Sequence, residues 1–313
     1  MVSAYVNILI IFALMFIGYL LSYKQWFNNQ TADVFSKLIL NIGLPCNMFL
    51  NITSSFSREE FLHLFSGMVI PIFSMLLTYG FSLLYAKIMK VEKKHFGTFS
   101  TMFTCSNTIF IGLPINLAIF GEASVPYVLL YYIVNTTIFW TIGVFMIAKD
   151  NPQIETATVS FHPTAALKKI FTPPLMGFLI GLLWIFLEWP VPQMATTFFS
   201  YLGNLTTPLS MFFIGIIIFF TGIKNIRLTK DTFGVLIGRF VISPLLVILL
   251  GHFIQVPALM LSVFIVQSSM PVQNSVPILA RSYGGDTEFA ASSMTWSVLI
   301  YLFYIPILLA IIL

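Results

Sequence analysis

The chain has 313 residues, of which 58% are hydrophobic and only 8% charged, and its mean hydropathy is +0.95. A soluble globular protein carries about 25% charged residues, so this composition excludes a nuclear, secreted or cytosolic protein and predicts an exterior in contact with membrane lipid. The net charge of +4 does not indicate a nucleic-acid partner, because positive loops beside membrane helices follow from the positive-inside rule. We expect a multi-pass protein of the cell membrane, the inner membrane in a bacterium.

A membrane-spanning helix needs roughly 20 apolar residues, and apolar runs broken by charges predict ten such helices and an all-α fold. The predicted spans are 4–22, 31–51, 67–87, 96–120, 124–147, 169–188, 194–223, 231–251, 257–281 and 287–313. No basic residue precedes the first run, so we interpret it as a span and not as a cleaved signal peptide.

The basic residues predict the orientation of these spans. Of 15 Lys and Arg residues, 13 lie on the side of the loops that join an odd span to the next even one. The opposite side has Arg58, and Arg239 lies inside the eighth span. Because positive loops stay in the cytoplasm, we expect both termini on the extracytoplasmic side.

The sequence also matches itself at an offset of 163 residues. This offset places Pro45 on Pro208, Pro114 on Pro277 and Gly121 on Gly284, without gaps. A duplication with five spans in each half requires the second copy to enter the membrane from the opposite side. The predicted parts are a first repeat at 1–150, a cytoplasmic linker at 151–168 and a second, inverted repeat at 169–313.

The fourth and ninth spans contain polar and helix-breaking residues where a membrane helix is usually apolar. The fourth has Ser106 and Asn107 followed by Pro114, and the ninth has Pro271 and Pro277 among polar side chains that include Gln273 and Asn274. Proline removes a backbone donor and disrupts the preceding turn, so we expect each span to break into two half-helices whose N-termini attract anions. The alternative is a simple kink or a site of close packing. Matching breaks in an inverted repeat favour a secondary transporter.

The motifs of the fourth span, Ser106-Asn107-Thr108, Gly112-Leu113-Pro114 and Phe120-Gly121-Glu122, closely resemble those of the auxin efflux carrier family, which includes bacterial malate and malonate permeases. Gly43-Leu44-Pro45 and the stretch from Met270 to Pro277 are similar to the same family. The resemblance implies ten spans, crossing broken helices four and nine, and a moving domain that carries the site past a scaffold of spans one, two, six and seven.

The resemblance also implies substrate contacts at Asn107, Asn135 and Pro271. One departure is that plant members have proline where this chain has Ser106. A buried amide such as Asn135 has a structural alternative, which is a hydrogen bond between helices. The full candidate substrate site is Asn107, Ser106, Asn135, Pro271, Gln273, Asn274, Asn47 and Arg239, and the candidate structural prolines are Pro114, Pro277, Pro45 and Pro208.

All acidic residues lie in loops or near the ends of the predicted spans. Cation exchangers that titrate a carboxylate need an acid within the membrane, so this distribution favours an organic-anion site of amide, hydroxyl and helix-end donors. Arg239 is the basic residue within a span. It is a candidate to attract the anion or to cap a half-helix C-terminus, with snorkelling to the interface as the alternative.

We therefore predict a secondary active transporter, not an enzyme, that moves malate or a similar carboxylate by elevator-type alternating access. A sodium-coupled organic-anion symporter is the alternative, and a membrane sensor or channel is a weaker one. No cofactor or metal site is predicted; protons or sodium are possible coupling ions. We expect a homodimer, and the Gly177–Gly181 spacing suits either a dimer surface or internal packing.

Overall fold

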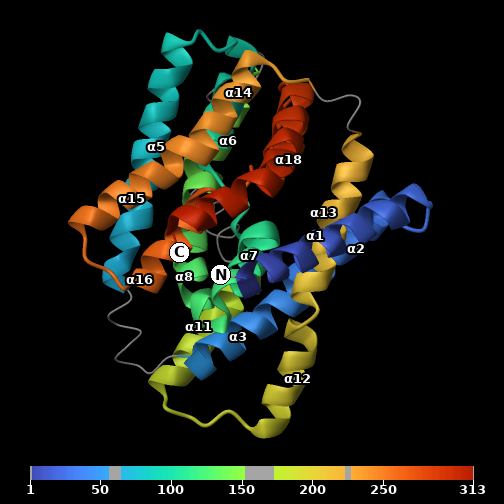
Figure 1. Cartoon of the computed structure of the whole chain (residues 1–313), viewed down its shortest axis with the longest axis vertical. Coiled ribbons are helices and arrows are strands. Elements are labelled where there is room, and N and C mark those ends of the chain that lie inside the picture. The colour runs from blue at the N-terminus through green and yellow to red at the C-terminus, as the bar shows by residue number, and fades with distance from the viewer. Residues whose placement is uncertain (1, 56–64, 152–172, 223–226, 313) are drawn as a thin grey trace. The chain divides into compact units, whose positions relative to one another are not determined.

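The computed structural model describes residues 2–55, 65–151, 173–222 and 227–312, and these are helical apart from short connections and one isolated β-bridge (Figure 1). Within these described ranges, five helical stretches are long and apolar enough to cross a membrane: Val69–Ile88, Glu122–Ala148, Gln193–Phe220, Lys230–Phe253 and Thr287–Ile312. Shorter apolar helices occupy several other predicted spans. The predicted linker lies outside the described residues except for Asn151, and so do Arg58, Lys168, Lys169 and Lys224.

The helical elements follow the predicted spans closely in the described residues, although several spans consist of two or more elements. In chain order the α-helices are α1 (Val2–Tyr23), α2 (Asn29–Leu38), α3 (Leu44–Ser55), α5 (Val69–Ile88), α6 (Phe96–Thr104), α7 (Leu113–Phe120), α8 (Val125–Ile138), α9 (Val144–Ala148), α11 (Pro173–Phe186), α12 (Gln193–Gly203), α13 (Thr206–Thr221), α14 (Lys230–Ile237), α15 (Ser243–Phe253), α16 (Ala258–Ser268), α17 (Ser275–Ser282) and α18 (Thr287–Ile312). The π-helical segments are η1 (Ile39–Gly43), η4 (Thr108–Gly112), η6 (Phe139–Gly143) and η8 (Gly238–Ile242), and the 3₁₀ segments are η2 (Phe65–Met68), η3 (Lys93–His95) and η5 (Glu122–Ser124).

The four prolines predicted to have structural roles all lie in the first turn of a helix. Pro45 and Pro114 are the second residues of α3 and α7, which follow η1 and η4 directly, and Pro208 and Pro277 are the third residues of α13 and α17. The helices α13 and α17 follow non-helical residues, so the missing N–H of Pro208 and Pro277 has no helical partner to lose there. Proline thus suits the starts of α13 and α17, whereas the break in the fourth span lies between Thr104 and Thr108 and not at Pro114.

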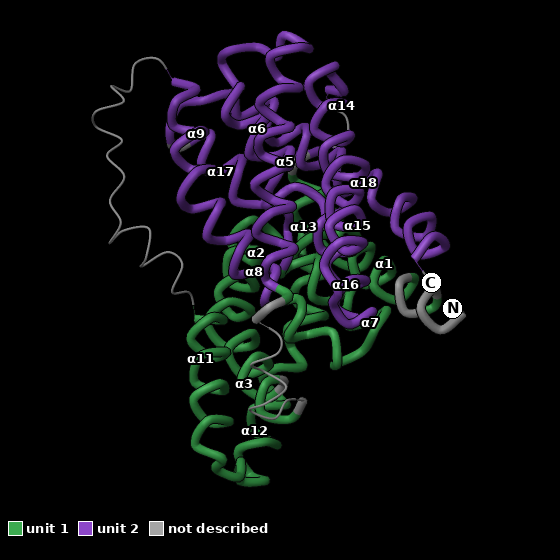
Figure 2. Tube along the Cα trace, turned by 90° about the vertical axis from the view of Figure 1, so that its left-hand side faces the viewer, with its two compact units in different colours: residues 1–67, 109–129, 170–220 green, residues 68–108, 130–169, 221–313 purple. Residues whose placement is uncertain are grey.

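The described chain divides into two compact units, coloured separately in Figure 2. Unit 1 contains residues 1–67, 109–129 and 170–220, and unit 2 contains residues 68–108, 130–169 and 221–313. Each unit takes chain from both halves of the sequence, so the units are not the two predicted repeats. Unit 1 includes the predicted spans one, two, six and seven.

Close helix packing within unit 1 depends on glycine. A Cβ on Gly177 of α11 would meet the carbonyl oxygen of Pro45 on α3 at 2.3 Å, and one on Gly18 of α1 would meet the carbonyl of Phe212 on α13 at 2.5 Å. Gly181 also packs on α3, against Phe49. The Gly177–Gly181 spacing is therefore explained by packing inside the chain, and the homodimer stays a prediction.

The proposed duplication has one local counterpart in the structure. Gly121 ends α7 with φ +72°, and its partner at the offset of 163, Gly284, follows α17 with φ +68°. Glycine adopts positive φ without the steric cost that a side chain imposes. This agreement is consistent with an inverted repeat, which stays a prediction.

Candidate functional site

The helix breaks predicted in the fourth and ninth spans are present, and both belong to unit 2 at the point of the break. In the fourth span α6 ends at Thr104, Cys105 is extended, and helical chain resumes at Thr108. In the ninth span α16 ends at Ser268 and α17 begins at Ser275. The backbone of these breaks leaves N–H and C=O groups that need partners away from water.

The two breaks satisfy part of this need by pairing with each other. Ser106 and Val272 form an antiparallel bridge, and the backbone N–H of Asn107 donates to the carbonyl of Pro271 at 2.8 Å. The side chains meet as well, because Asn107 Nδ2 donates to Asn274 Oδ1 at 3.0 Å. The structure thus brings four of the predicted site residues together: Ser106, Asn107, Pro271 and Asn274.

Asn135 on α8, in the neighbouring fifth span, forms hydrogen bonds with the backbone of the first break. Its Oδ1 accepts from the N–H of Ser106 at 2.9 Å and its Nδ2 donates to the carbonyl of Ser106 at 3.0 Å, so one amide satisfies both backbone groups. Nδ2 also contacts Gln273 Oε1 at 3.3 Å. This geometry favours the structural alternative, a hydrogen bond between helices, for Asn135.

The second break has an equivalent support that the sequence did not single out. Ser297 Oγ on α18 accepts from the N–H of Val272 at 3.0 Å. Gln267, at the end of α16, donates from Nε2 to the carbonyl of Thr108 at 3.3 Å. A serine in a long membrane helix is common, so its sequence gives no sign of this role.

Arg239 does not snorkel, because its side chain is fully buried with 0% exposure. Its Nε donates to Met270 O at 3.0 Å, and Nη1 donates to Phe103 O at 3.3 Å and Thr104 O at 2.5 Å. Nη2 donates to the carbonyl of Ser268. The guanidinium therefore caps the C-termini of α6 and α16, which was one of the predicted roles, and no Asp or Glu pairs with it in the described part of the chain.

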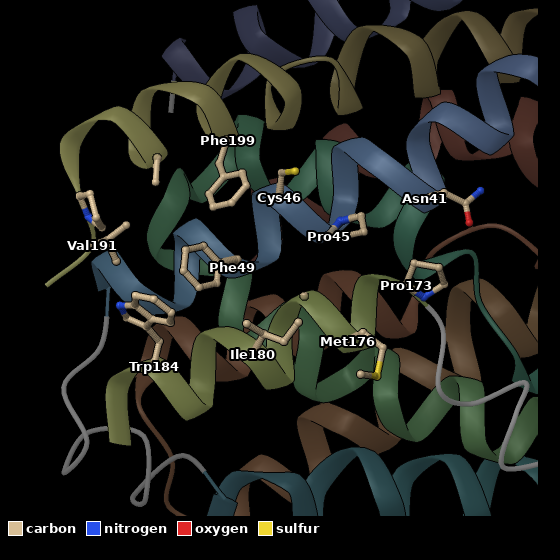
Figure 3. Close-up of a pocket in the computed structure, with 13 residues that line it drawn as sticks. Asn41, Pro45, Cys46, Phe49, Pro173, Met176, Ile180, Trp184, Val191 and Phe199 are labelled. Atoms are coloured by element: carbon tan, nitrogen blue, oxygen red, sulfur yellow. The ribbon is translucent and has the colours of Figure 1, made fainter. Parts of the chain in front are cut away.

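Asn47 is the one predicted site residue in unit 1, where its backbone packs against Gly203 at the end of α12. Nearby, α3, α11 and α12 surround a cavity of about 660 Å³. Figure 3 shows the side chains that line it, including Pro45, Phe49, Ile180, Trp184 and Phe199. Asn41 also lines it and donates to the carbonyl of Lys37. This apolar lining suits hydrocarbon and offers little to a carboxylate.

The sequence analysis did not predict a polar cluster at one end of unit 2, in which His95 and Asp231 are buried and Lys94 is exposed. His95 Nδ1 lies 3.0 Å from Asp286 Oδ2, and His95 Nε2 lies 2.9 Å from Asp231 Oδ2. The imidazole stacks on Phe289 with ring centroids 3.9 Å apart. Lys94 pairs with Asp286 at 3.1 Å. These residues come from loops predicted to lie on the same, cytoplasmic side of the membrane. That prediction was the sequence feature that could have indicated that they meet.

Asp150, just after α9, caps the other end of the fourth-span half-helix. Its carboxylate accepts from the N–H groups of Gly97 and Thr98 at 2.6 and 2.7 Å, and from Thr98 Oγ1 at 2.7 Å. The adjacent Asn151 donates to the carbonyl of Tyr283 at the end of α17. These two residues tie the end of the fifth span to both broken segments.

The carboxyls at this end of unit 2 have shifted pKa values. Burial raises the pKa of Asp150 above its ordinary value, and hydrogen bonds from Thr98 and Gly97 only partly offset this. Burial also acts to raise the pKa of Asp286, but hydrogen bonds from the Phe289 N–H, His95 and Lys94 outweigh it and the pKa is lowered. Among the described residues, no group of three or more His, Cys, Asp and Glu side chains is arranged to hold a metal ion.

The chain matches the model of a family described as membrane transport protein over residues 3–309. It is 23% identical over 307 residues to an uncharacterized transporter of Methanothermobacter thermautotrophicus, with 96% of each chain covered. It is 25% identical over 300 residues to an uncharacterized transporter of Methanocaldococcus jannaschii, with 92% of each covered. Neither relative's description gives a substrate.

Proposed function

From its membership of the membrane transport protein family, the family of the auxin efflux carriers, the chain is a membrane transporter, and we propose that it carries a small organic anion as a secondary active transporter. A short carboxylate such as malate is the proposed substrate. The proposed site is the pair of breaks in unit 2, with Asn107 and Asn274 as the principal contacts and Gln273 beside them.

The observation that carries this proposal is an unsatisfied donor. Asn274 Nδ2 is buried and has no hydrogen-bond acceptor among the described residues, while Asn274 Oδ1 is occupied by Asn107. Leaving a buried donor unpaired costs about 1–3 kcal/mol, so this position favours a ligand that accepts hydrogen bonds. An ionised carboxylate only accepts, and at these breaks the described chain places no acid that would repel it.

The division of the chain supports an elevator-type mechanism. In the described residues the paired breaks belong to unit 2 alone, and unit 1 gathers the spans predicted as the scaffold. In the proposed cycle unit 2 carries the bound anion, and Pro271, Pro277 and Arg239 keep the breaks in shape. Because no acid lies among the paired breaks in the described residues, we propose uniport, anion exchange, or symport in which the proton travels on the substrate.

One observation favours sodium-coupled symport as a second candidate. Gln267 Oε1 is fully buried and has no donor among the described residues. An unpaired amide oxygen beside a broken helix is the type of ligand that a hard cation binds. Dependence of uptake on a sodium gradient separates this candidate from the first.

Uptake of labelled malate into proteoliposomes tests the proposal. Wild type is compared with Asn107→Ala, and with Asn41→Ala as a control because Asn41 lies in unit 1 and its side chain donates to the nearby carbonyl of Lys37. Loss of a hydrogen bond to a charged ligand costs about 1.5–3 kcal/mol, so Asn107→Ala should weaken malate affinity roughly 10- to 100-fold. Normal uptake by Asn107→Ala, with the control unchanged, would move the site away from the breaks. Absence of uptake by all three proteins would reject malate, and the same assay with other carboxylates would follow.

A further inference from the structure

The buried guanidinium of Arg239 lies where two helices end. Phe103 and Thr104 are the last residues of α6, and Ser268 is the last residue of α16. All three carbonyls, and that of Met270, accept from Arg239. The carbonyl end of a helix carries roughly half a negative charge. One arginine thus meets two such ends, with a combined charge of about −1.

The opposite kind of helix end begins on the far side of each break. Helical chain resumes at Thr108 in the fourth span and at Ser275 in the ninth. The amide end of a helix carries roughly half a positive charge. Since Arg239 offsets the carbonyl ends, the amide ends of the paired breaks are left without compensation by any ionised side chain in the described residues.

A second observation points to a missing negative charge. Burying an isolated cation is costly unless it is paired, and charged side chains within membranes normally face a partner or an aqueous cavity. In the described chain Arg239 has carbonyl dipoles but no carboxylate. Asn274, whose Nδ2 lacks an acceptor, lies in the same break as Met270, to which Arg239 donates.

We infer that Arg239 determines the charge selectivity of the site: by neutralising the C-termini of α6 and α16 it makes the paired breaks electropositive, so that they bind an anion in preference to a neutral molecule of the same shape. Arg239 is a positioning residue in this role, since its donors bind backbone carbonyls of both breaks. The inference rests on the proposed function and identifies which group of unit 2 selects the anion.

Two ligands of equal shape and different charge separate an electrostatic role from a structural one. Malate is dianionic near neutral pH, and its diamide, malamide, is neutral with the same carbon skeleton. A purely structural loss would weaken both ligands alike, whereas loss of a charge weakens only malate. The measured quantity is therefore the ratio of the malamide Kd to the malate Kd, obtained by calorimetry on purified protein.

Arg239→Gln keeps a hydrogen-bonding side chain and removes the charge. One unit charge several ångströms away in a medium of intermediate dielectric corresponds to roughly a 10- to 100-fold change in affinity. We expect the ratio to fall by that factor in Arg239→Gln. Arg281→Gln is the matched control, because Arg281 is exposed at the end of α17 in the same unit and its loss changes the net charge equally. Its ratio should stay unchanged.

Arg239→Lys provides the second test and serves alone if Arg239→Gln does not fold. A buried lysine loses its proton more readily than arginine, so the ratio of the lysine variant should fall between about pH 7 and pH 10 while that of wild type stays constant. An unchanged ratio in Arg239→Gln, or an Arg239→Lys ratio that stays at the wild-type value at a pH where the lysine has lost its proton, would overturn the inference alone. Wild type that binds malate no better than malamide would overturn it directly. Wild type that binds neither ligand would instead reject the proposed substrate, and the inference with it.

Discussion

The two units of the chain differ in how many polar side chains they bury. Of 30 buried polar or charged side chains in the described residues, 25 belong to unit 2. Both units bring backbones together at glycine, as at Gly177 in unit 1 and Gly97 in unit 2. Small residues let helices approach closely without polar groups, whereas broken helices require partners for their backbone. The units therefore differ in their buried polar groups and not in how closely their backbones approach at glycine.

The largest expected effect comes from removing the central polar group of unit 2. Arg239→Met would leave four carbonyls at the ends of α6 and α16 without their donor, at about 1–3 kcal/mol each where no water replaces it. We expect a loss of stability on the order of 4 kcal/mol, measured by thermal unfolding in detergent. Arg281→Met, at an exposed site, should change little. Equal stability of the two variants would contradict the capping role.

The α3–α11 contact of unit 1 should be sensitive to added volume. In Gly177→Ala the new Cβ would lie within 2.3 Å of the Pro45 carbonyl, so α3 and α11 must separate. Overpacking of this kind costs about 1–3 kcal/mol. Gly80→Ala on α5 is the control, because no atom lies within 4 Å of its Cβ position, and it should be neutral or stabilise by roughly 0.5–1 kcal/mol. The same unfolding assay compares them, and a harmless Gly177→Ala would show that the α3–α11 contact is loose.

The cap on α6 should show a smaller effect. Asp150→Asn keeps one oxygen but turns an amide N–H₂ toward the N–H donors of Gly97 and Thr98. We expect a loss of about 1–2 kcal/mol in thermal unfolding. Asp33→Asn, at an exposed position of α2 in unit 1, should have no measurable effect. A stable Asp150→Asn would mean that the cost of burying the carboxylate, which raises its pKa, offsets the hydrogen bonds that it accepts.

The smallest expected effect is on the dependence of stability on pH. The folded pKa of Asp286 is below its ordinary value of 3.8, so its contribution is present above that value and is lost as pH falls through the folded pKa. Asp150 has the opposite sign: its raised pKa makes folding less favourable as pH rises through the interval above 3.8. Unfolding between about pH 3 and pH 6 should therefore lose less stability on acidification in Asp286→Asn than in wild type. A steeper loss would show that the His95 cluster does not stabilise the ionised carboxyl.

Much of the helical framework could be predicted from the sequence. Apolar runs predict helices, so the helical segments and the breaks in the fourth and ninth predicted spans agree with the structure in the described residues. Proline alone does not predict a break, because α18 continues through Pro306. The burial of His95, Asp231 and Asp286 could not be predicted. Each lies in a different polar loop, and a loop residue usually faces solvent.

Composition and the order of apolar runs by themselves determined the all-helical membrane class, because a lipid exterior and the length of a spanning helix leave a strong local pattern. Tertiary structure alone decided what each polar residue does. Asn135 satisfies the backbone of Ser106 and Arg239 caps two helices from a third, since hydrogen bonds between residues about 30 and about 135 positions apart in sequence depend on which helices pack together. A local sequence pattern does not determine which helices pack together, so it cannot predict these hydrogen-bond partners.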